Sequence, residues 1–232
     1  MRAAHRLRSA TWLLVALTVG ACAKSDEDWR ADLGSKDPYV RGLAAIGLGL
    51  QSPRAAAPAL PVLFETVDRS QTGLEAEAAQ VIVRIGAEHV EALLDELITN
   101  PLMTDQRRGT ILNALVEAGA KAAPSITRRL AGDGREQAGH LGDVLLNIGA
   151  PAVPAIAALL ESEGDAAPRR FAAFLLVKLG PQARAARPAL ERALGSDDAE
   201  LRAVAEQALR ALGRAPSRAG PGSRGPSGAG PR

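Results

Sequence analysis

A small residue closes an apolar helical pattern six times along this chain, at intervals of 34, 33, 30, 31 and 33 residues: Ser52, Gly86, Gly119, Gly149, Gly180 and Gly213. The positions four and eight residues before each of them are all apolar: Leu48, Ile82, Leu115, Leu145, Leu176, Leu209 and Ala44, Ala78, Ile111, Leu141, Ala172, Ala205. A period of this length with helical spacing is typical of an α-solenoid, in which each helix pair buries its apolar face against its neighbours. The recurrence predicts an all-α, right-handed α-solenoid of about five to six helix pairs.

The helices of each pair follow from the same register. The pattern predicts first helices at 38–51, 73–85, 106–118, 136–148, 167–179 and 198–212. Second helices are expected at 56–67, 90–98, 123–130, 153–160 and 184–194, with Pro58, Pro124, Pro154 and Pro188 in their first turns, where a missing N–H is tolerated. Glycine at a closing position favours a left-handed cap, so Gly86, Gly119, Gly149, Gly180 and Gly213 are interpreted as structural caps.

Polar residues recur at the predicted starts of the first helices. Asp37, Thr104, Asp165 and Asp198 are side chains that cap a helix by accepting backbone N–H bonds. Four residues after each of them stands an arginine: Arg41, Arg108, Arg169 and Arg202. We interpret the series as helix caps, with the arginines reaching to the next repeat, rather than as a binding stripe.

Three runs of sequence resemble HEAT-like repeats of the type named after phycobilisome lyases. They are Asp37-Pro-Tyr-Val-Arg-Gly-Leu-Ala-Ala, Gly149-Ala-Pro-Ala-Val-Pro-Ala-Ile and Arg169-Arg-Phe-Ala-Ala-Phe-Leu-Leu-Val-Lys-Leu-Gly. The resemblance covers residues 29–213 and implies the fold, while the family includes scaffolds, adaptor subunits, chromophore lyases and DNA-repair enzymes. Before the repeats, Trp29 and Leu33 are expected in a helix that covers the first of them.

The first 21 residues have the layout of an export signal. Arg2, Arg6 and Arg8 precede an uncharged run from Ser9 to Ala21. The string Leu17-Thr18-Val19-Gly20-Ala21-Cys22 is similar to the lipobox of bacterial lipoproteins, and Cys22 is the only cysteine in the sequence. The resemblance implies cleavage before Cys22 and attachment of a diacylglyceryl group to its thiol. This places the protein in the bacterial cell envelope, with 22–28 as a tether; Ala23 favours the outer membrane where there are two. Secretion without a lipid is the alternative.

Charge argues against a nucleic-acid partner. Without the three arginines of the signal and the four in residues 214–232, the 28 basic residues fall to 21 against 26 acidic residues, a net charge of −5. Aromatic residues make up 3% of the chain, so stacking platforms for bases are scarce. Residues 214–232 contain only Gly, Pro, Ser, Ala and Arg, and we expect them to form a disordered basic tail.

Acidic residues gather in 68–96 and basic residues in 165–192, which predicts an array that is acidic near its anchored end and basic toward the other. Second helices usually line the concave surface of such solenoids. Candidate partner-binding residues are therefore Glu91, Asp95, Arg128, Arg187 and Arg192. Departures from the repeat mark further places to examine: Glu75, Ala138 with Gly139 and Gly142, the basic fifth unit and the tail.

We identify no catalytic residues, metal ligands or cofactor motif. His89 and His140 stand in different repeats without Cys or His at ligand spacing. The leading hypothesis is a non-enzymatic scaffold for an unknown protein partner. A lyase-like or other enzyme is the alternative, although Trp29, Tyr39, Phe64, Phe171 and Phe174 are mostly expected in the core. A third reading is binding of anionic polymers through the tail, with an affinity that falls steeply with salt.

Overall fold

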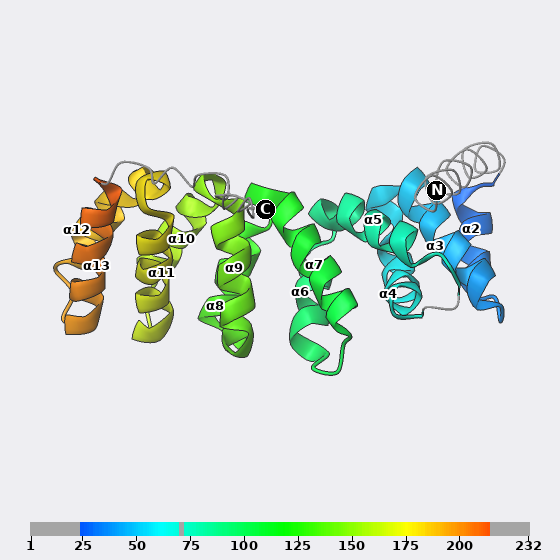
Figure 1. Ribbon diagram of the computed structural model, residues 1–232, viewed down its shortest axis with the longest axis horizontal. Coiled ribbons are helices and arrows are strands. Elements are labelled where there is room, and N and C mark those ends of the chain that lie inside the picture. Colours follow the sequence, from blue (N-terminus) through cyan, green and yellow to red (C-terminus); the bar gives the residue numbers. More distant parts are fainter. Residues whose placement is uncertain (1–23, 70–71, 214–232) are drawn as a thin grey trace, which may run out of the picture.

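The computed structural model describes residues 24–69 and 72–213, and this part of the chain consists of helices joined by turns and short loops, without strands. The all-α prediction is therefore confirmed. Figure 1 shows the helices side by side in a long array that runs from α2 (Asp26–Asp32) at one end to α13 (Ala199–Leu212) at the other. Cys22, the signal at 1–21 and the tail at 214–232 lie outside the described residues.

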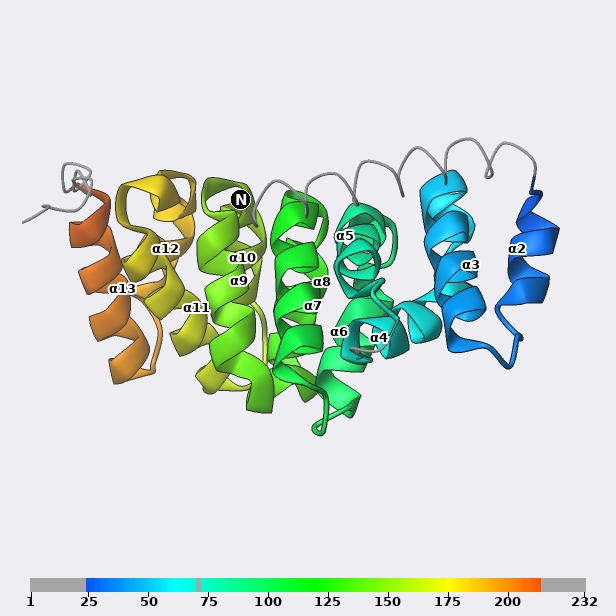
Figure 2. The ribbon, with the colours of Figure 1, turned by 45° about the vertical axis from the view of Figure 1, so that its right-hand side comes forward.

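The predicted first helices form one row of neighbours. They are α3 (Pro38–Gln51), α5 (Glu75–Ile85), α7 (Asp105–Ala118), α9 (Ala138–Ile148), α11 (Ala166–Leu179) and α13. Each contacts the next in the series, and the turned view in Figure 2 shows the row along the array. The register of the closing residues therefore places these helices within one or two residues of their observed ends.

The second helices are α4 (Leu60–Asp68), α6 (Val90–Thr99), α8 (Ala123–Ala131), α10 (Val153–Leu160) and α12 (Arg187–Ala193). From α6 onward each contacts the next, while α4 packs against α3, α5 and α7. Short 3-10 turns connect the helices at Pro53–Ala55, Ala57–Ala59, Gly86–Glu88, Gly119–Lys121, Asp133–Gln137, Ala150–Ala152 and Gly180–Ala186.

Two second helices begin later than predicted because 3-10 turns take up their expected starts. Pro58 lies in the turn before α4, not in its first turn, and the residue before a proline is disfavoured in an α-helix. The helix α12 begins at Arg187, after the turn Gly180–Ala186. Pro124, Pro154 and Pro188 do stand in the first turns of α8, α10 and α12.

Four first helices begin at the polar caps that the sequence predicts. Asp37, Thr104, Asp165 and Asp198 each accept hydrogen bonds from backbone N–H groups in the first turn. The N–H of Ala167 lowers the pKa of Asp165, and the Arg170 guanidinium and two backbone N–H groups lower that of Asp198. Because these pKa values are depressed, the stabilisation is present above the ordinary carboxyl pKa and is lost as pH falls through the lowered one.

The closing residues divide into two groups by backbone conformation. Gly119, Gly149 and Gly180 have φ of 59°, 74° and 54° with ψ near −130°, as at the first central position of a type II′ turn, a region that favours glycine. Ser52, Gly86 and Gly213 have negative φ. The prediction of a left-handed cap at every closing position is therefore wrong. Ser52, Gly86 and Gly213 do not have positive φ. Gly119, Gly149 and Gly180 have positive φ, but their ψ lies outside the left-handed helical range.

The core runs continuously along the array and is built mainly from Ala, Leu, Ile and Val side chains. Eleven of the twelve recurrent apolar residues are buried, and Leu209 in α13 is partly buried. Glycines bring some helices very close: a Cβ on Gly49 of α3 would lie 2.3 Å from Val81 Cγ1 of α5. Because such contacts lie between helices of successive pairs, the apolar core continues from one repeat to the next and is not confined to each pair.

The helix α2 covers the first repeat, as its apolar residues predict. Trp29 is 6% exposed, and its ring lies over Gly47 of α3, where a Cβ would approach it to 2.7 Å. The indole N–H donates to Gln51 Oε1 at 2.9 Å, and Ser25 and Asp28 form a capping box at the start of α2. The apolar face of α3 is therefore covered at this end.

Candidate interaction surface

The five predicted partner-binding residues lie on three second helices. Glu91 and Asp95 belong to α6, Arg128 to α8, and Arg187 and Arg192 to α12. Their side chains are between 49% and 68% exposed. They are therefore accessible, but each also takes part in an ion pair within the chain.

The acids of α6 are paired with bases of α8. Arg128 Nη1 lies 3.0 Å from Glu91 Oε1, and Arg129 contacts both Glu91 and Asp95. A hydrogen bond from Ser125 is the largest cause of the lowered pKa of Glu91, and the two arginines add to it. The acidic part of the expected surface is thus neutralised by the next repeat, not left as an unpaired acidic face.

Sequence reasoning missed Arg129, which is the centre of this cluster. Its side chain is 21% exposed, and its Nη1 also lies 2.9 Å from Asp133 Oδ2. Burial acts to lower the pKa of Arg129, and hydrogen bonds to Glu91, Asp133 and Asp95 outweigh it, so that the pKa is raised. The signal was present in the sequence, because Arg129 stands 34 residues after Asp95, one repeat further on.

The bases of α12 are also partnered. Arg192 Nε donates to Glu161 Oε1 at 2.9 Å, at the end of α10, and Arg187 lies 3.7 Å from Glu191 within α12. The second helices therefore carry ion pairs across α6–α8 and α10–α12. The charged groups of a partner would replace these intramolecular ion pairs at a small cost in free energy, because an exposed ion pair contributes only about 0–1 kcal/mol.

The four arginines of the cap series do not reach to the next repeat, so that interpretation is wrong. Arg41 and Arg202 donate to the carbonyls of Ser35 and Ser196, and Arg169 donates to that of Leu160. Arg108 lies 3.5 Å from Asp105, one turn away in α7. Arg41 and Arg202 thus meet the loop that enters their helix, whereas Arg169 meets the last residue of α10 and Arg108 stays within α7.

The arginines beside that series do cross between repeats. Arg170 of α11 binds Asp198 and Glu200 of the next first helix, and Arg107 of α7 binds Asp68 and Glu96 of the preceding second helices. Arg107 and Arg170, each one residue away from a member of that series, thus form the ion pairs to carboxylates of a neighbouring repeat.

Glu88 forms a further inter-repeat link at the edge of the array. It lies 3.4 Å from Arg54 Nε and 3.3 Å from Lys121 Nζ, which stand 34 residues before and 33 residues after it. The hydrogen bond from Lys121 is the first cause of its lowered pKa. The repeat spacing therefore places oppositely charged side chains of successive repeats next to each other, as it does the apolar residues of the core.

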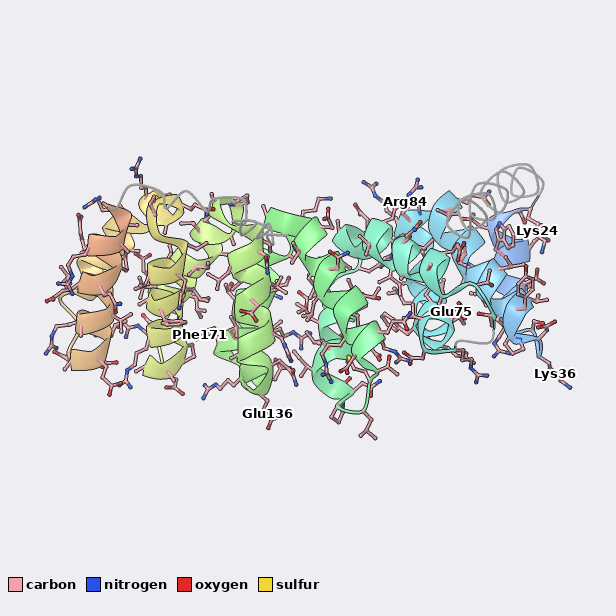
Figure 3. All side chains as sticks on the ribbon, viewed as in Figure 1. Lys24, Lys36, Glu75, Arg84, Glu136 and Phe171 are labelled. Atoms are coloured by element: carbon pink, nitrogen blue, oxygen red, sulfur yellow. The ribbon has the colours of Figure 1, made fainter. Side chains whose placement is uncertain are left out.

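Two departures from the repeat have local structural explanations. Glu75 accepts from the backbone N–H of Gly73 at 3.1 Å, which satisfies a donor at the start of α5. Gly142 makes room for Phe171 of α11, whose Cζ would be 2.7 Å from a Cβ; Phe171 is labelled in Figure 3. Neither residue needs a ligand to account for it.

The aromatic residues are less uniformly buried than predicted. Trp29 and Phe64 lie in the core, and Phe171 packs against it, but Tyr39 and Phe174 are 44% and 45% exposed. Phe174 stacks on Phe171 at 6.3 Å, and Lys178 Nζ lies 5.2 Å from the Phe174 ring centre. On α11 the exposed ring is thus covered in part by its own neighbours.

The histidines do not come together. His89 Nε2 lies 2.7 Å from the Pro53 carbonyl oxygen, which ties two repeats together, and His140 is exposed on α9. Within 24–69 and 72–213 no group of three or more His, Cys, Asp or Glu side chains is arranged to hold a metal ion. In the same ranges no single helix has the length and apolar composition needed to cross a membrane.

Comparison with known proteins gives no family assignment. Neither a scan against models of protein families nor a search of curated proteins found a match.

Proposed function

We propose that this protein is a membrane-anchored, non-enzymatic interaction scaffold of the bacterial cell envelope, built as a right-handed α-solenoid of HEAT-like helix pairs. The recurrent closing residues, the continuous core and the neighbouring rows of helices support the repeat assignment. In such arrays the binding surface is extended, because each repeat contributes a strip of it.

One observation carries the scaffold proposal: α6, α8, α10 and α12 contact one another in succession, and α6, α8 and α12 carry five exposed charged side chains along this row. Their ion pairs keep the charges oriented without burying them. Charges arranged in this way confer specificity and speed association with a partner of complementary charge pattern.

The anchor follows from Cys22, which precedes the start of α2 by four residues. Acyl chains on this cysteine attach the array by its α2 end, and each buried methylene contributes about 0.8 kcal/mol, so two or more chains hold a protein on a membrane almost permanently. The surface at α12 then lies at the opposite end of the array from the anchor (Figure 1).

Replacing Cys22 by Ser should move the protein from the membrane fraction to the soluble fraction or leave it unprocessed. The measurement is fractionation of the native cells together with the intact mass of the recovered protein. Ser9→Ala, within the uncharged run, is the matched control and should leave the lipid-modified mass unchanged. A lipid-modified Cys22→Ser protein would refute the anchor.

The scaffold is tested by cross-linking in the native envelope followed by recovery of the bound protein. Deletion of 214–232 combined with Arg187→Ala and Arg192→Ala should reduce recovery of the partner at least about tenfold, because charged contacts are lost at the surface. Arg84→Ala removes an exposed charge from α5 and should have no effect. Equal recovery from the combined variant and wild type would overturn this surface.

Binding of an anionic polymer would give a different result in the same assay. Its affinity would fall steeply between low and physiological salt, because counterions compete for the arginines. A recovered protein partner whose binding tolerates this change of salt contradicts the polymer reading.

A further inference from the structure

An open pocket of about 420 Å³ lies at the end of the fifth helix pair. It is formed where the end of α10, the first turn of α11 and the end of α12 meet. Two arginines and one acid line it, Arg169, Arg192 and Glu161, together with the small residues Ala189, Ala193 and Ser196. The charged side chains give it a net charge of +1.

Arg169 has unused hydrogen-bonding capacity in this pocket. Its Nε donates to the carbonyl of Leu160 at 3.1 Å, and this fixes the guanidinium at the pocket wall. Among the residues that the structure describes, no carboxylate oxygen lies within 4.0 Å of its guanidinium nitrogens. The remaining N–H groups form a planar fork that matches a carboxylate.

The first helix pair shows which ligand an arginine at this position takes. Arg41 stands eleven residues before Ser52, as Arg169 stands eleven before Gly180. Arg41 also holds loop carbonyls with one nitrogen, but its Nη2 binds Glu65 of α4 at 2.8 Å. In the fifth pair, α12 presents Ala189 and Ala193 toward the pocket, and no carboxylate of that helix reaches Arg169.

The second arginine at the pocket is held by a replaceable contact. Arg192 donates both Nε and Nη2 to the same oxygen of Glu161, and its side chain is 65% exposed. An incoming carboxylate can share Arg192 with Glu161, while the negative charge of Glu161 weakens its binding.

We propose that this pocket binds a carboxylate of a partner peptide, with Arg169 as the principal ligand and Arg192 at the rim. The inference rests on the proposed scaffold function and gives its partner a chemical class. Ala189 and Ala193 supply the space, and Glu161 sets the affinity by competing for the same bases. The carboxylate belongs either to an Asp or Glu side chain or to a peptide C-terminus.

The pocket is tested by titrating Cys22→Ser protein recovered from the soluble fraction with three short peptides, while the side-chain Nε–H resonances of Arg169 and Arg192 are followed by NMR; in Arg169→Gln the Arg192 resonance gives the affinity. Acetyl-Gly-Glu-Gly-amide carries a side-chain carboxylate, acetyl-Gly-Gly-Gly a C-terminal one, and acetyl-Gly-Gln-Gly-amide neither. We expect saturable shifts with at least one of the two acids and none with the Gln peptide; the acid that binds more tightly identifies the source.

Three variants separate the roles of the residues. Arg169→Gln should weaken binding by about tenfold or more, because a charge-assisted pair is lost. Glu161→Gln should tighten it several-fold, and a gain of binding cannot arise from misfolding. Arg184→Gln removes an exposed arginine of the turn before α12 and should leave the affinity within twofold. Equal binding of the Gln peptide, or unchanged affinity in Arg169→Gln, overturns the proposal.

The same variants distinguish failure of the pocket from failure of the scaffold. If a cross-linked partner is recovered equally well by wild type and Arg169→Gln, the pocket assignment is wrong and the scaffold stands. If wild type recovers no partner although acidic peptides bind, the scaffold is wrong and the pocket serves a free carboxylate ligand.

Discussion

Replacing Gly149 by Val is expected to lower the free energy of unfolding by about 1–3 kcal/mol, because a β-branched residue is strained in the backbone conformation of this position. Gly149 has φ of 74° and ψ of −138°, a conformation that a β-branched residue rarely adopts. A Cβ there would also lie 2.8 Å from Gln182 Oε1 in the turn Gly180–Ala186 of the next repeat, but this is the end of an exposed side chain that can turn away. Denaturant unfolding of wild type and variant measures the difference.

Two glycines provide matched controls for this substitution. Gly119 has the same positive φ, but nothing lies within 4 Å of its Cβ position, so Gly119→Val isolates the backbone strain. Gly139 is an exposed residue inside α9 with open space around it, so Gly139→Val should change stability by less than about 0.5 kcal/mol. A loss in Gly149→Val no larger than that in Gly139→Val would contradict the strained cap.

The helices and the polar caps at their N-termini could be predicted because both depend on residues close together in sequence. The spacing of Leu48 and Ala44 before Ser52 gives α3 its buried face, and Asp37 gives its start. The starts of α4 and α12 could not be predicted to the residue, because 3-10 turns compete with the first α-helical turn at a similar energy. Local patterns do not decide between them.

The candidate surface was predicted only in part, because ion pairing depends on contacts between repeats. Glu91 and Asp95 were correctly singled out as surface charges, but their partner Arg129 stands in another helix. The pocket at Arg169 was not predicted, since it follows from the combination of small residues in α12 and the absence there of a carboxylate within reach. Such a site becomes visible when equivalent arginines are compared in the folded chain.

Replacing Arg107 by Met should cost about 2–4 kcal/mol of stability, because it leaves two partly buried carboxylates without their cation. Arg107 is 15% exposed and joins α7 to Asp68 at the end of α4 and to Glu96 of α6, whose Oε1 lies 2.6 Å from Nη1. Its guanidinium also lies 5.5 Å from the Phe64 ring centre. Methionine keeps an apolar stem of similar length over Phe64, so the variant tests the charge rather than the packing.

Neutralising the acids as well should restore part of that stability. In the triple variant Arg107→Met, Asp68→Asn, Glu96→Gln no unpaired charge remains, and replacing a whole buried ion network is often nearly neutral. Arg84→Met removes an exposed arginine of α5 that projects from the edge of the array (Figure 3) and should change stability by less than about 0.5 kcal/mol. If unfolding shows equal stability for Arg107→Met and Arg84→Met, the network does not hold α4, α6 and α7 together. A loss in Arg107→Met that the triple variant reverses would show that the cost comes from the unpaired carboxylates of Asp68 and Glu96, and not from lost packing over Phe64.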